Sequence, residues 1–199
     1  IFVSQSLGVS AKTSEEIYQL AVPVTVQINS SVGSGTGVII ATDGNTYTVL
    51  TNHHVVCEYG SFVNNCNTNR SYSIVTHSYK SYTANFVQPL QTDANSPDLA
   101  ILTFTTSNSY PVATLGDSNQ VVPGTFVWVY GFPGLDGRRG VEREPQFTQG
   151  SITSLPQRKT GGYTMNYSAW TWGGMSGGAV FDSEGRVIGI HGQGDLEPS

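Results

Sequence analysis

The sequence has little charge, little cysteine and no long hydrophobic run, and each shortage excludes a class of protein. Of its 199 residues only 12% are charged, and the net charge of −5 comes without a basic run. Nucleic-acid binding needs a basic face, so nucleic acid is not an expected partner. No apolar stretch approaches the roughly 20 residues that a membrane-spanning helix needs. Hydrophobic residues still make up 38%, enough for a core in one large domain or two small lobes.

Cysteine is limited to Cys57 and Cys66. A disulfide between them would close a small loop, and two free thiols are the alternative. His53 and His54 lie nearby, but no second Cys or His pair has ligand spacing, so neither a metal nor a cofactor is expected. The disulfide requires an oxidising compartment. A periplasmic or secreted location is therefore the expectation, with the cytoplasm as the alternative.

Glycine, by contrast, is abundant at 23 residues, and Ser, Thr, Asn, Val and Tyr are common. This mixture favours many short strands joined by tight turns. One short helix is expected at about 14–20, because Thr13 and Glu16 have the spacing of a capping box and Pro23 would end the helix. Alternation and turn signals predict strands at 22–28, 38–41, 46–51, 71–76, 81–87, 98–104, 125–130, 147–155, 162–167, 179–181 and 186–191.

These strands fall into two groups, which predicts an all-β fold, either a barrel or a sandwich. The segment 105–124, rich in Ser, Asn, Pro and Gly, is the expected linker between the groups. Two other segments are interpreted as loops: the small residues 31–37 as a turn, and the charged, Gly-rich segment 134–146 as a solvated surface loop.

The most unusual stretch is 173–178, Gly-Gly-Met-Ser-Gly-Gly. Glycines crowded around one hydroxyl indicate a backbone bent into a special shape. A nucleophilic serine needs this, because backbone N–H groups must point at the oxyanion formed by its attack. If Ser176 is the nucleophile, the N–H groups of Gly174 and Ser176 are the natural donors. A plain glycine-rich loop is the alternative. A nucleophile elbow of an α/β-hydrolase would need its acid and histidine after the serine.

A serine nucleophile needs a base and a group that orients the base. Of the four histidines, His53, His54, His77 and His191, His54 is followed by Val55 and Val56, which can hold it rigidly at a strand-to-helix turn. Asp98 begins an apolar strand, where its carboxylate can be buried against a histidine. Asp93 is the competing carboxylate.

Three blocks, at 51–56, 98–102 and 174–178, together resemble the signature blocks of trypsin-like serine peptidases, and they occur in that family's His, Asp, Ser order. The Gly-rich segment at 33–40 resembles the bacterial branch that includes the HtrA proteases and the trypsin-like domains of cyanobacterial proteins. The resemblance implies that His54 is the general base, that Asp98 orients it, and that Ser176 attacks the peptide bond. It also implies an oxyanion hole made by the N–H groups of Gly174 and Ser176.

The fold implied by the resemblance is a pair of antiparallel β-barrels with the site between them. The expected division is a lead-in with the short helix at 1–21, an N-terminal barrel at 22–112 and a C-terminal barrel at 113–199. Family members usually continue with one more strand and a C-terminal helix. The sequence therefore predicts that this last strand and the C-terminal helix are absent from the chain and that a companion fragment or chain completes the barrel.

Two departures from the family concern activation and specificity. Met175 stands where trypsin-type enzymes carry an aspartate that pairs with a new N-terminus, so Ile1 is not expected to act as that switch. Thr171 and His191 match the threonine and histidine that bind the substrate carboxylate in glutamyl endopeptidases, and Gly192 is expected to contact substrate beside them. An acidic preference is one reading of this pocket. A small or apolar preference, shaped by Trp170 or Trp172, is another, and a basic preference is disfavoured because no aspartate lies near the pocket base.

The sequence therefore predicts a serine endopeptidase that acts on polypeptides. The alternative from another class is a catalytically silent, peptidase-like binding module within a larger protein. An esterase with the same triad would need no different residues.

Overall fold

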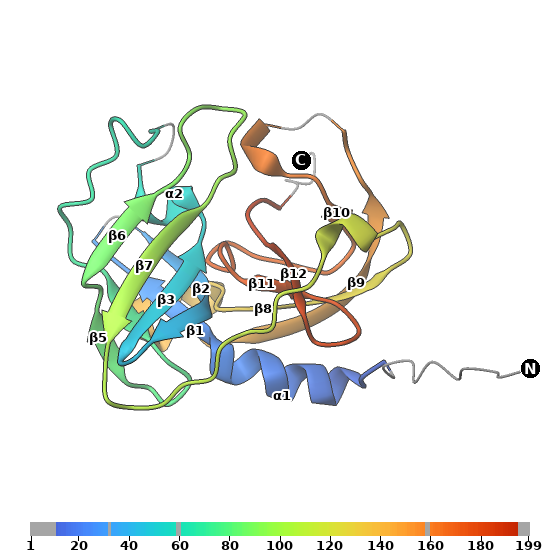
Figure 1. Cartoon of the computed structure of the whole chain (residues 1–199), viewed down its shortest axis with the longest axis horizontal. Coiled ribbons are helices and arrows are strands. Elements are labelled where there is room, and N and C mark those ends of the chain that lie inside the picture. Colours follow the sequence, from blue (N-terminus) through green and yellow to red (C-terminus); the bar gives the residue numbers. More distant parts are fainter. Residues whose placement is uncertain (1–10, 32, 59–60, 158–159, 195–199) are drawn as a thin grey trace, which may run out of the picture.

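Residues 11–31, 33–58, 61–157 and 160–194 are described by the structure, a computed structural model of the chain. Two curled antiparallel sheets form two adjacent lobes, with few helices besides α1 (Figure 1). The prediction of an all-β fold with a short N-terminal helix is confirmed.

The first sheet has seven strands in the order β5-β4-β1-β2-β3-β7-β6. Its strands are β1 (Thr25–Asn29), β2 (Ser34–Asp43), β3 (Thr46–Thr51), β4 (Ser73–Val75), β5 (Ser81–Thr83), β6 (Phe86–Pro89) and β7 (Ala100–Thr105). Alternate side chains of β3 are buried, as its alternating sequence predicts. One of them, Tyr47, belongs to a buried aromatic cluster and stacks on Phe104 of β7 with ring centroids 5.2 Å apart.

The second sheet has five strands in the order β10-β9-β8-β11-β12. Its strands are β8 (Phe126–Gly131), β9 (Gln146–Ser154), β10 (Asn166–Tyr167), β11 (Ala179–Phe181) and β12 (Val187–Ile190). Short 3-10 turns lie in the connections: η1 (Ser118–Gln120), η2 (Leu135–Gly137), η3 (Gly140–Glu142) and η4 (Thr160–Gly162). Much of the predicted strand at 162–167 is therefore loop, and only its last two residues pair.

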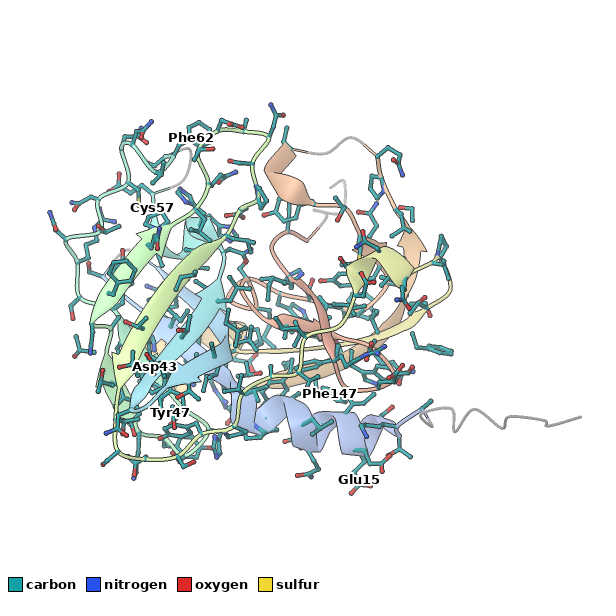
Figure 2. The ribbon with its side chains drawn as sticks, in the orientation of Figure 1. Glu15, Asp43, Tyr47, Cys57, Phe62 and Phe147 are labelled. Carbon is teal, nitrogen blue, oxygen red and sulfur yellow. A yellow bond between two sulfur atoms is a disulfide. The ribbon has the colours of Figure 1, made fainter. Side chains whose placement is uncertain are left out.

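The helix α1 (Ser14–Val24) packs against the second lobe, where Ile17, Ala21 and Val24 are buried beside β8 and β11. Phe147 of the second sheet lies above this helix (Figure 2), and its ring meets Tyr18 edge-on. The predicted capping box is present, because Thr13 and Glu16 bond to each other's backbone N–H groups.

The end of α1 differs from the prediction. The helix continues through Pro23 to Val24, and β1 begins only at Thr25. A proline this close to the end removes one intrahelical hydrogen bond. Burial of Val24 and the bond from Thr25 Oγ1 to the Ala21 carbonyl (2.8 Å) stabilise the last turn.

The segment 31–37 was expected to be a turn, but β2 begins at Ser34. Gly35 and Gly37 serve close packing rather than a turn. A Cβ at Gly35 would lie 2.6 Å from the Val55 side chain, and one at Gly37 would lie 2.5 Å from that of Val49. These contacts bring β2 against the helix α2 (His53–Val56) and against β3, where the site begins.

In the described part of the chain no helix is both long enough and apolar enough to cross a membrane. The segment that follows β12 leads into residues 195–199, which lie outside the described residues, as does Ile1. The expectations of a missing last strand and a companion chain, and that of an inactive Ile1 switch, therefore stay predictions.

Candidate active site

His54 and Asp98 are brought together at the end of the first sheet where α2 lies (Figure 1). His54 lies in α2, the single turn that follows β3, and Asp98 lies just before β7. The ring Nδ1 of His54 is 2.6 Å from Asp98 Oδ2, and the backbone N–H of His54 donates to Asp98 Oδ1 at 3.0 Å. Because β3 and β7 are paired neighbours, these contacts follow from the sheet register.

The Asp98 carboxylate is buried and has a third donor. The hydroxyl of Tyr163 also donates to Oδ2, while the main chain of Asp98 is held by Asn52 and by the Gly161 carbonyl. Burial raises the pKa of Asp98, but the hydrogen bonds and charge of His54, with the bond from Tyr163, outweigh it and hold that pKa below its usual value. Asp98 is therefore an ionised partner for an imidazolium.

The other candidates for base and acid have different surroundings. His53 is buried, with Nε2 2.9 Å from the Ser61 carbonyl, and burial lowers its pKa. Asp93 is exposed and accepts hydrogen bonds from the N–H groups of Asn95 and Ser96, so it organises its own loop.

Ser176 lies in a loop whose backbone requires glycine at two positions. Gly174 and Gly177 have φ of +98° and +90°, values that disfavour any residue with a Cβ. A Cβ at Gly177 would lie 1.8 Å from the Thr36 carbonyl. The Ser176 hydroxyl donates to the Gly192 carbonyl at 3.4 Å. Ser176 and His54 line the same cavity of about 520 Å³, together with Ser34 and Gly174.

The backbone N–H groups expected to form the oxyanion hole, those of Gly174 and Ser176, have no acceptor in the part of the chain that the structure describes. The Gly173 carbonyl accepts from the Gly134 N–H at 2.9 Å. Because N–H and C=O point in opposite directions across a trans peptide, this bond turns the Gly174 N–H away from Gly134.

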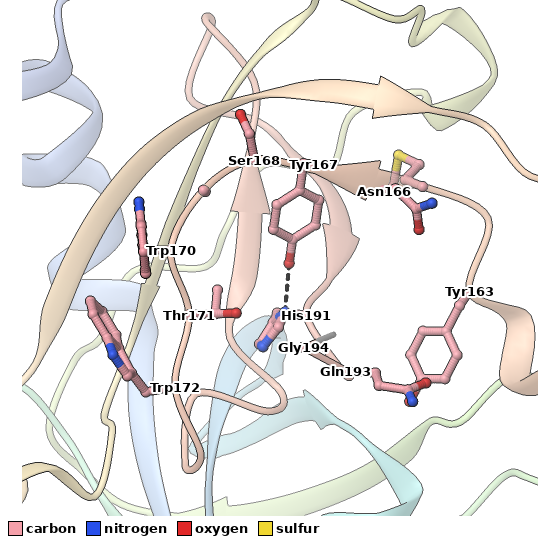
Figure 3. Close-up of a pocket in the computed structure, with 12 residues that line it drawn as sticks. Tyr163, Asn166, Tyr167, Ser168, Trp170, Thr171, Trp172, His191, Gln193 and Gly194 are labelled. Atoms are coloured by element: carbon pink, nitrogen blue, oxygen red, sulfur yellow. Dashed lines mark hydrogen bonds between the residues drawn. The ribbon is translucent and has the colours of Figure 1, made fainter. Parts of the chain in front are cut away.

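Thr171 and His191 line a second cavity, of about 530 Å³ (Figure 3). His191 is 5% exposed, and its Nδ1 lies 2.6 Å from the Tyr167 hydroxyl. Burial raises the pKa of Tyr167, so its hydroxyl is the donor and His191 Nδ1 the acceptor. Burial also lowers the pKa of His191 to about 4, with a smaller contribution from His54. A neutral His191 therefore carries its proton on Nε2.

Gly192 lines a third cavity, together with His54 and Asp98, and a side chain would not fit there. A Cβ there would lie 2.7 Å from the Tyr163 hydroxyl and 2.5 Å from the Tyr163 ring. The absence of a side chain at Gly192 gives Tyr163 room to reach Asp98.

The family model of the trypsin-like peptidase domain matches residues 35–190. The chain belongs to the trypsin-like peptidase domain family. This membership supports the expectation of a serine endopeptidase.

A solved structure described as an HtrA-type protease AlgW with tripeptide is similar to this trypsin-like domain, with 23% identity and a TM-score of 0.66. The match covers 89% of this chain and 53% of that protein, so the chain spans about half of that protein's length. At this identity the likeness concerns the fold alone. Among curated proteins no match is found.

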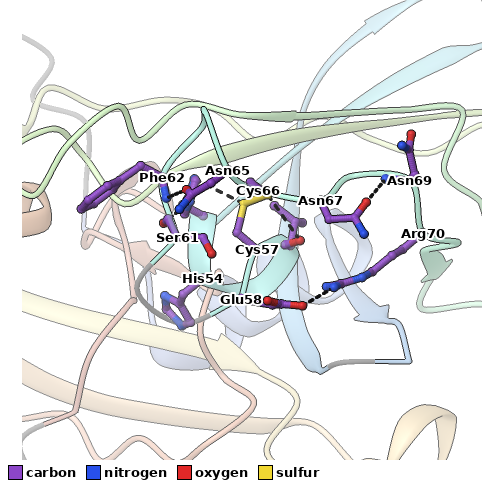
Figure 4. Close-up of a disulfide and its surroundings, with 12 residues drawn as sticks. His54, Cys57, Glu58, Ser61, Phe62, Asn65, Cys66, Asn67, Asn69 and Arg70 are labelled. Atoms are coloured by element: carbon purple, nitrogen blue, oxygen red, sulfur yellow. Dashed lines mark hydrogen bonds and ion pairs between the residues drawn. A yellow bond between two sulfur atoms is a disulfide. The ribbon is translucent and has the colours of Figure 1, made fainter.

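In this trypsin-like domain a disulfide closes the loop after α2. Cys57 and Cys66 are bonded, with Cα atoms 5.1 Å apart, so the predicted disulfide is present (Figure 4). His53 and these two cysteines form a possible ligand cluster among the described residues. Its two sulfur atoms are bonded to each other, which leaves no thiolate for a metal.

Arg143 corrects the interpretation of 134–146 as a solvated loop. It is 3% exposed, and burial lowers its pKa to about 10. Arg138 and Glu144 of the same segment form an exposed ion pair at 2.5 Å. A charged, Gly-rich sequence is typical of exposed loops and of loops with a buried arginine alike. Most of the hydrogen-bond partners of Arg143 lie far away in the chain.

The sequence did not single out Tyr163, Tyr167 or Arg143. The contacts of these residues join segments distant in the chain, and their local sequences carry no motif.

Proposed function

We propose that this chain is an active serine endopeptidase in which His54 is the general base, Asp98 orients it and Ser176 is the nucleophile. The observation that carries the proposal is the 2.6 Å contact between His54 Nδ1 and the buried Asp98 carboxylate, in a cavity shared with Ser176. The contact fixes the tautomer in which His54 Nε2 is free to accept a proton.

The reaction follows from this arrangement. Ser176 Oγ attacks the carbonyl carbon of the scissile bond and gives its proton to His54 Nε2. The oxyanion receives hydrogen bonds from the free N–H groups of Gly174 and Ser176, and the Asp98 carboxylate stabilises the imidazolium. His54 then donates its proton to the leaving amine. Water, activated by His54, hydrolyses the acyl-enzyme. Ser176 must first exchange the Gly192 carbonyl for His54 as its hydrogen-bond partner, a rearrangement common on substrate binding.

Hydrolysis of a peptide substrate by three variants tests this function. Ser176→Ala should lose activity to background, and Asp98→Asn should lower kcat by about 10³–10⁴-fold, because the amide stabilises the wrong tautomer. Ser81→Ala, an exposed serine in the first lobe, is the matched control and should retain activity. A wild-type protein that hydrolyses no peptide while folded would favour the alternative, a silent binding module.

The same site supports a preference for an acidic residue before the scissile bond. Among the described residues, none that lines the cavity with Thr171 and His191 is Asp or Glu. The Thr171 hydroxyl and the Nε2–H of His191 are hydrogen-bond donors suited to one carboxylate. Gly194, which follows β12, also lines this cavity, and Gly192 lines a neighbouring cavity with His54.

Peptides that differ only in the residue before the cleaved bond test this preference. We expect kcat/KM to be highest for Glu, and Thr171→Val to lower the Glu:Leu ratio about tenfold while activity on the Leu peptide is retained, because only the carboxylate loses a donor. Cleavage after Ala or Leu as fast as after Glu would contradict the acidic assignment and indicate an apolar pocket shaped by its tryptophans.

The disulfide supports an oxidising compartment, the periplasm or the cell exterior, as the location of this activity.

A further inference from the structure

Arg143 is a buried cation without an acidic partner. No carboxylate of the described residues lies within ion-pair distance of its guanidinium. Burying a charge is costly unless every donor is satisfied. An arginine kept in such a place must make contacts that a neutral or smaller side chain could not.

Those contacts are with oxygen acceptors from both lobes. From the second lobe, Nη1 donates to the carbonyls of Phe132 and Gly174, and Nε donates to that of Gly140. From the first, Nη2 reaches the carbonyls of Ile28 (3.3 Å) and Gly35 (2.9 Å) and Oδ1 of Asn29 (3.0 Å). The guanidinium thus lies where β1 and β2 meet the loop 173–178, which holds Ser176 and is called the nucleophile loop or oxyanion loop below.

The contact with Gly174 is the one that matters for chemistry. The Gly174 N–H is one of the two free oxyanion donors, and its carbonyl, on the next peptide, accepts from Arg143 Nη1 (3.3 Å) and from Thr36 Oγ1 (2.8 Å). Thr36 Oγ1 in turn accepts from the Phe132 N–H (3.0 Å). A Cβ at Gly174 would lie 2.7 Å from the Phe132 carbonyl and 3.2 Å from Arg143 Nη1. The backbone around the Gly174 N–H is therefore packed against the Arg143 guanidinium and against the Phe132 carbonyl that accepts from it.

Met175, the residue after Gly174, cannot replace Arg143 in holding the loop. Met175 is fully buried in an apolar cluster with Val127, Val129 and Ile152. It cannot form a charge pair that would hold the loop.

We propose that Arg143 is the positioning residue that holds the oxyanion loop in its working conformation, by bonding Gly174 and Phe132 to the first lobe. This rests on the proposed function of Ser176. A planar guanidinium has five donors in a fixed fork, and a lysine ammonium has three at one point. Lysine keeps the charge but cannot span the same acceptors.

Arg143→Lys tests the proposal through kcat measured per active site, with active sites counted by burst titration. We expect kcat to fall about 10²-fold, as when one oxyanion donor is lost, while KM changes less than about threefold. Arg143→Ala should recover part of this loss when guanidinium ion is added at millimolar concentration. Arg186→Lys is the control, because Arg186 pairs with Asp182 and Glu184 at the surface, and its kcat should not change.

A merely structural arginine would give a different result. Arg143→Lys would then lower the melting temperature or the number of active sites, with kcat per site at least half that of the wild type. That outcome overturns the proposal. If Arg143→Lys does not fold, Asn29→Ala decides instead, because it removes one acceptor of Nη2 and keeps the arginine. A fall in kcat of threefold or more supports the proposal, and an unchanged kcat overturns it.

A crystal structure of Arg143→Lys in the Ser176→Ala background separates this proposal from the proposed function. We expect the Gly173–Gly174 peptide to turn and to lose its bond with the Gly134 N–H. An unchanged loop overturns the role of Arg143 even if the wild type is active. A wild type without Ser176-dependent hydrolysis refutes the proposed function, whatever the loop does.

Discussion

At the scale of single residues, Tyr163 adds a third group to the His54–Asp98 pair. Its hydroxyl and His54 Nδ1 both donate to Asp98 Oδ2. Burial is the main cause that raises the pKa of Tyr163, and the bond to Asp98 adds to it. The Tyr163 hydroxyl therefore stays protonated, and a donor, over the pH range in which the enzyme works. The Asp98 charge is thus divided between two donors.

Tyr163→Phe should change the pH profile of the enzyme. Without the hydroxyl, Asp98 binds the proton shared with His54 more tightly, so we expect the acid limb of kcat/KM to move upward by about 0.5 pH unit, a fraction of the energy of one charged hydrogen bond. The shift is upward because the His54 imidazolium is better stabilised in the variant, and His54 must lose this proton before it can act as the base.

Tyr72→Phe is the matched control for this profile. The Tyr72 hydroxyl is also buried and donates to the Val56 carbonyl at 2.6 Å. Its loss should lower stability and leave the profile in place. Identical acid limbs for the wild type and Tyr163→Phe would show that Tyr163 has no part in the reaction.

The sequence predicted the residues whose signal is local. His54, Asp98 and Ser176 each lie in a short motif, and the structure brings the first two into contact and places the third in the same cavity. Tyr163 contacts Asp98 across 65 positions, and Arg143 contacts Ile28 across 115. No property of either local sequence distinguishes these residues from ordinary loop residues, so only the fold reveals them.

At the scale of elements, the helix α1 contributes to the core of the second lobe. Ile17 and Ala21 are fully buried against the second lobe, and Trp128 Nε1 donates to the Ser14 hydroxyl at 3.0 Å. The helix therefore braces β8, which pairs with β11, the strand that follows the Ser176 loop.

Ile17→Ala should lower the free energy of unfolding by about 3 kcal/mol, through lost burial and the cavity that remains. Leu20→Ala on the same helix is the control, because Leu20 is 42% exposed, and it should cost less than about 1 kcal/mol. Urea denaturation of both variants provides the measurement. Equal losses would mean that α1 is not docked through its Ile17 face.

Elements with strong periodicity were predicted well. The range 46–51 is the observed β3, because alternation and an Asp-Gly turn both fix it. The errors arise where tertiary packing outweighs local preference. Pro23 remains in a helix because the turn around it is buried, and the glycines at 35 and 37 lie in a strand because neighbouring side chains leave no room for a Cβ.

At the scale of the whole molecule, the two lobes supply different parts of one site. The first provides His54 and Asp98, and the second provides Ser176 and the cavity with Thr171 and His191. Thr36 and Arg143 bond the lobes together next to the nucleophile loop. The catalytic geometry therefore depends on the lobe junction, and variants there should affect turnover more than binding.

The most direct test of the account is to map the site of covalent labelling by a fluorophosphonate. We expect the wild type to gain one adduct by intact mass, and peptide mapping to place it on Ser176. His54→Ala should label at least 10³-fold more slowly, because the serine loses its base. Labelling of another serine, or of Ser176 at the same rate in His54→Ala, would contradict the assignment of His54, Asp98 and Ser176 as one catalytic unit.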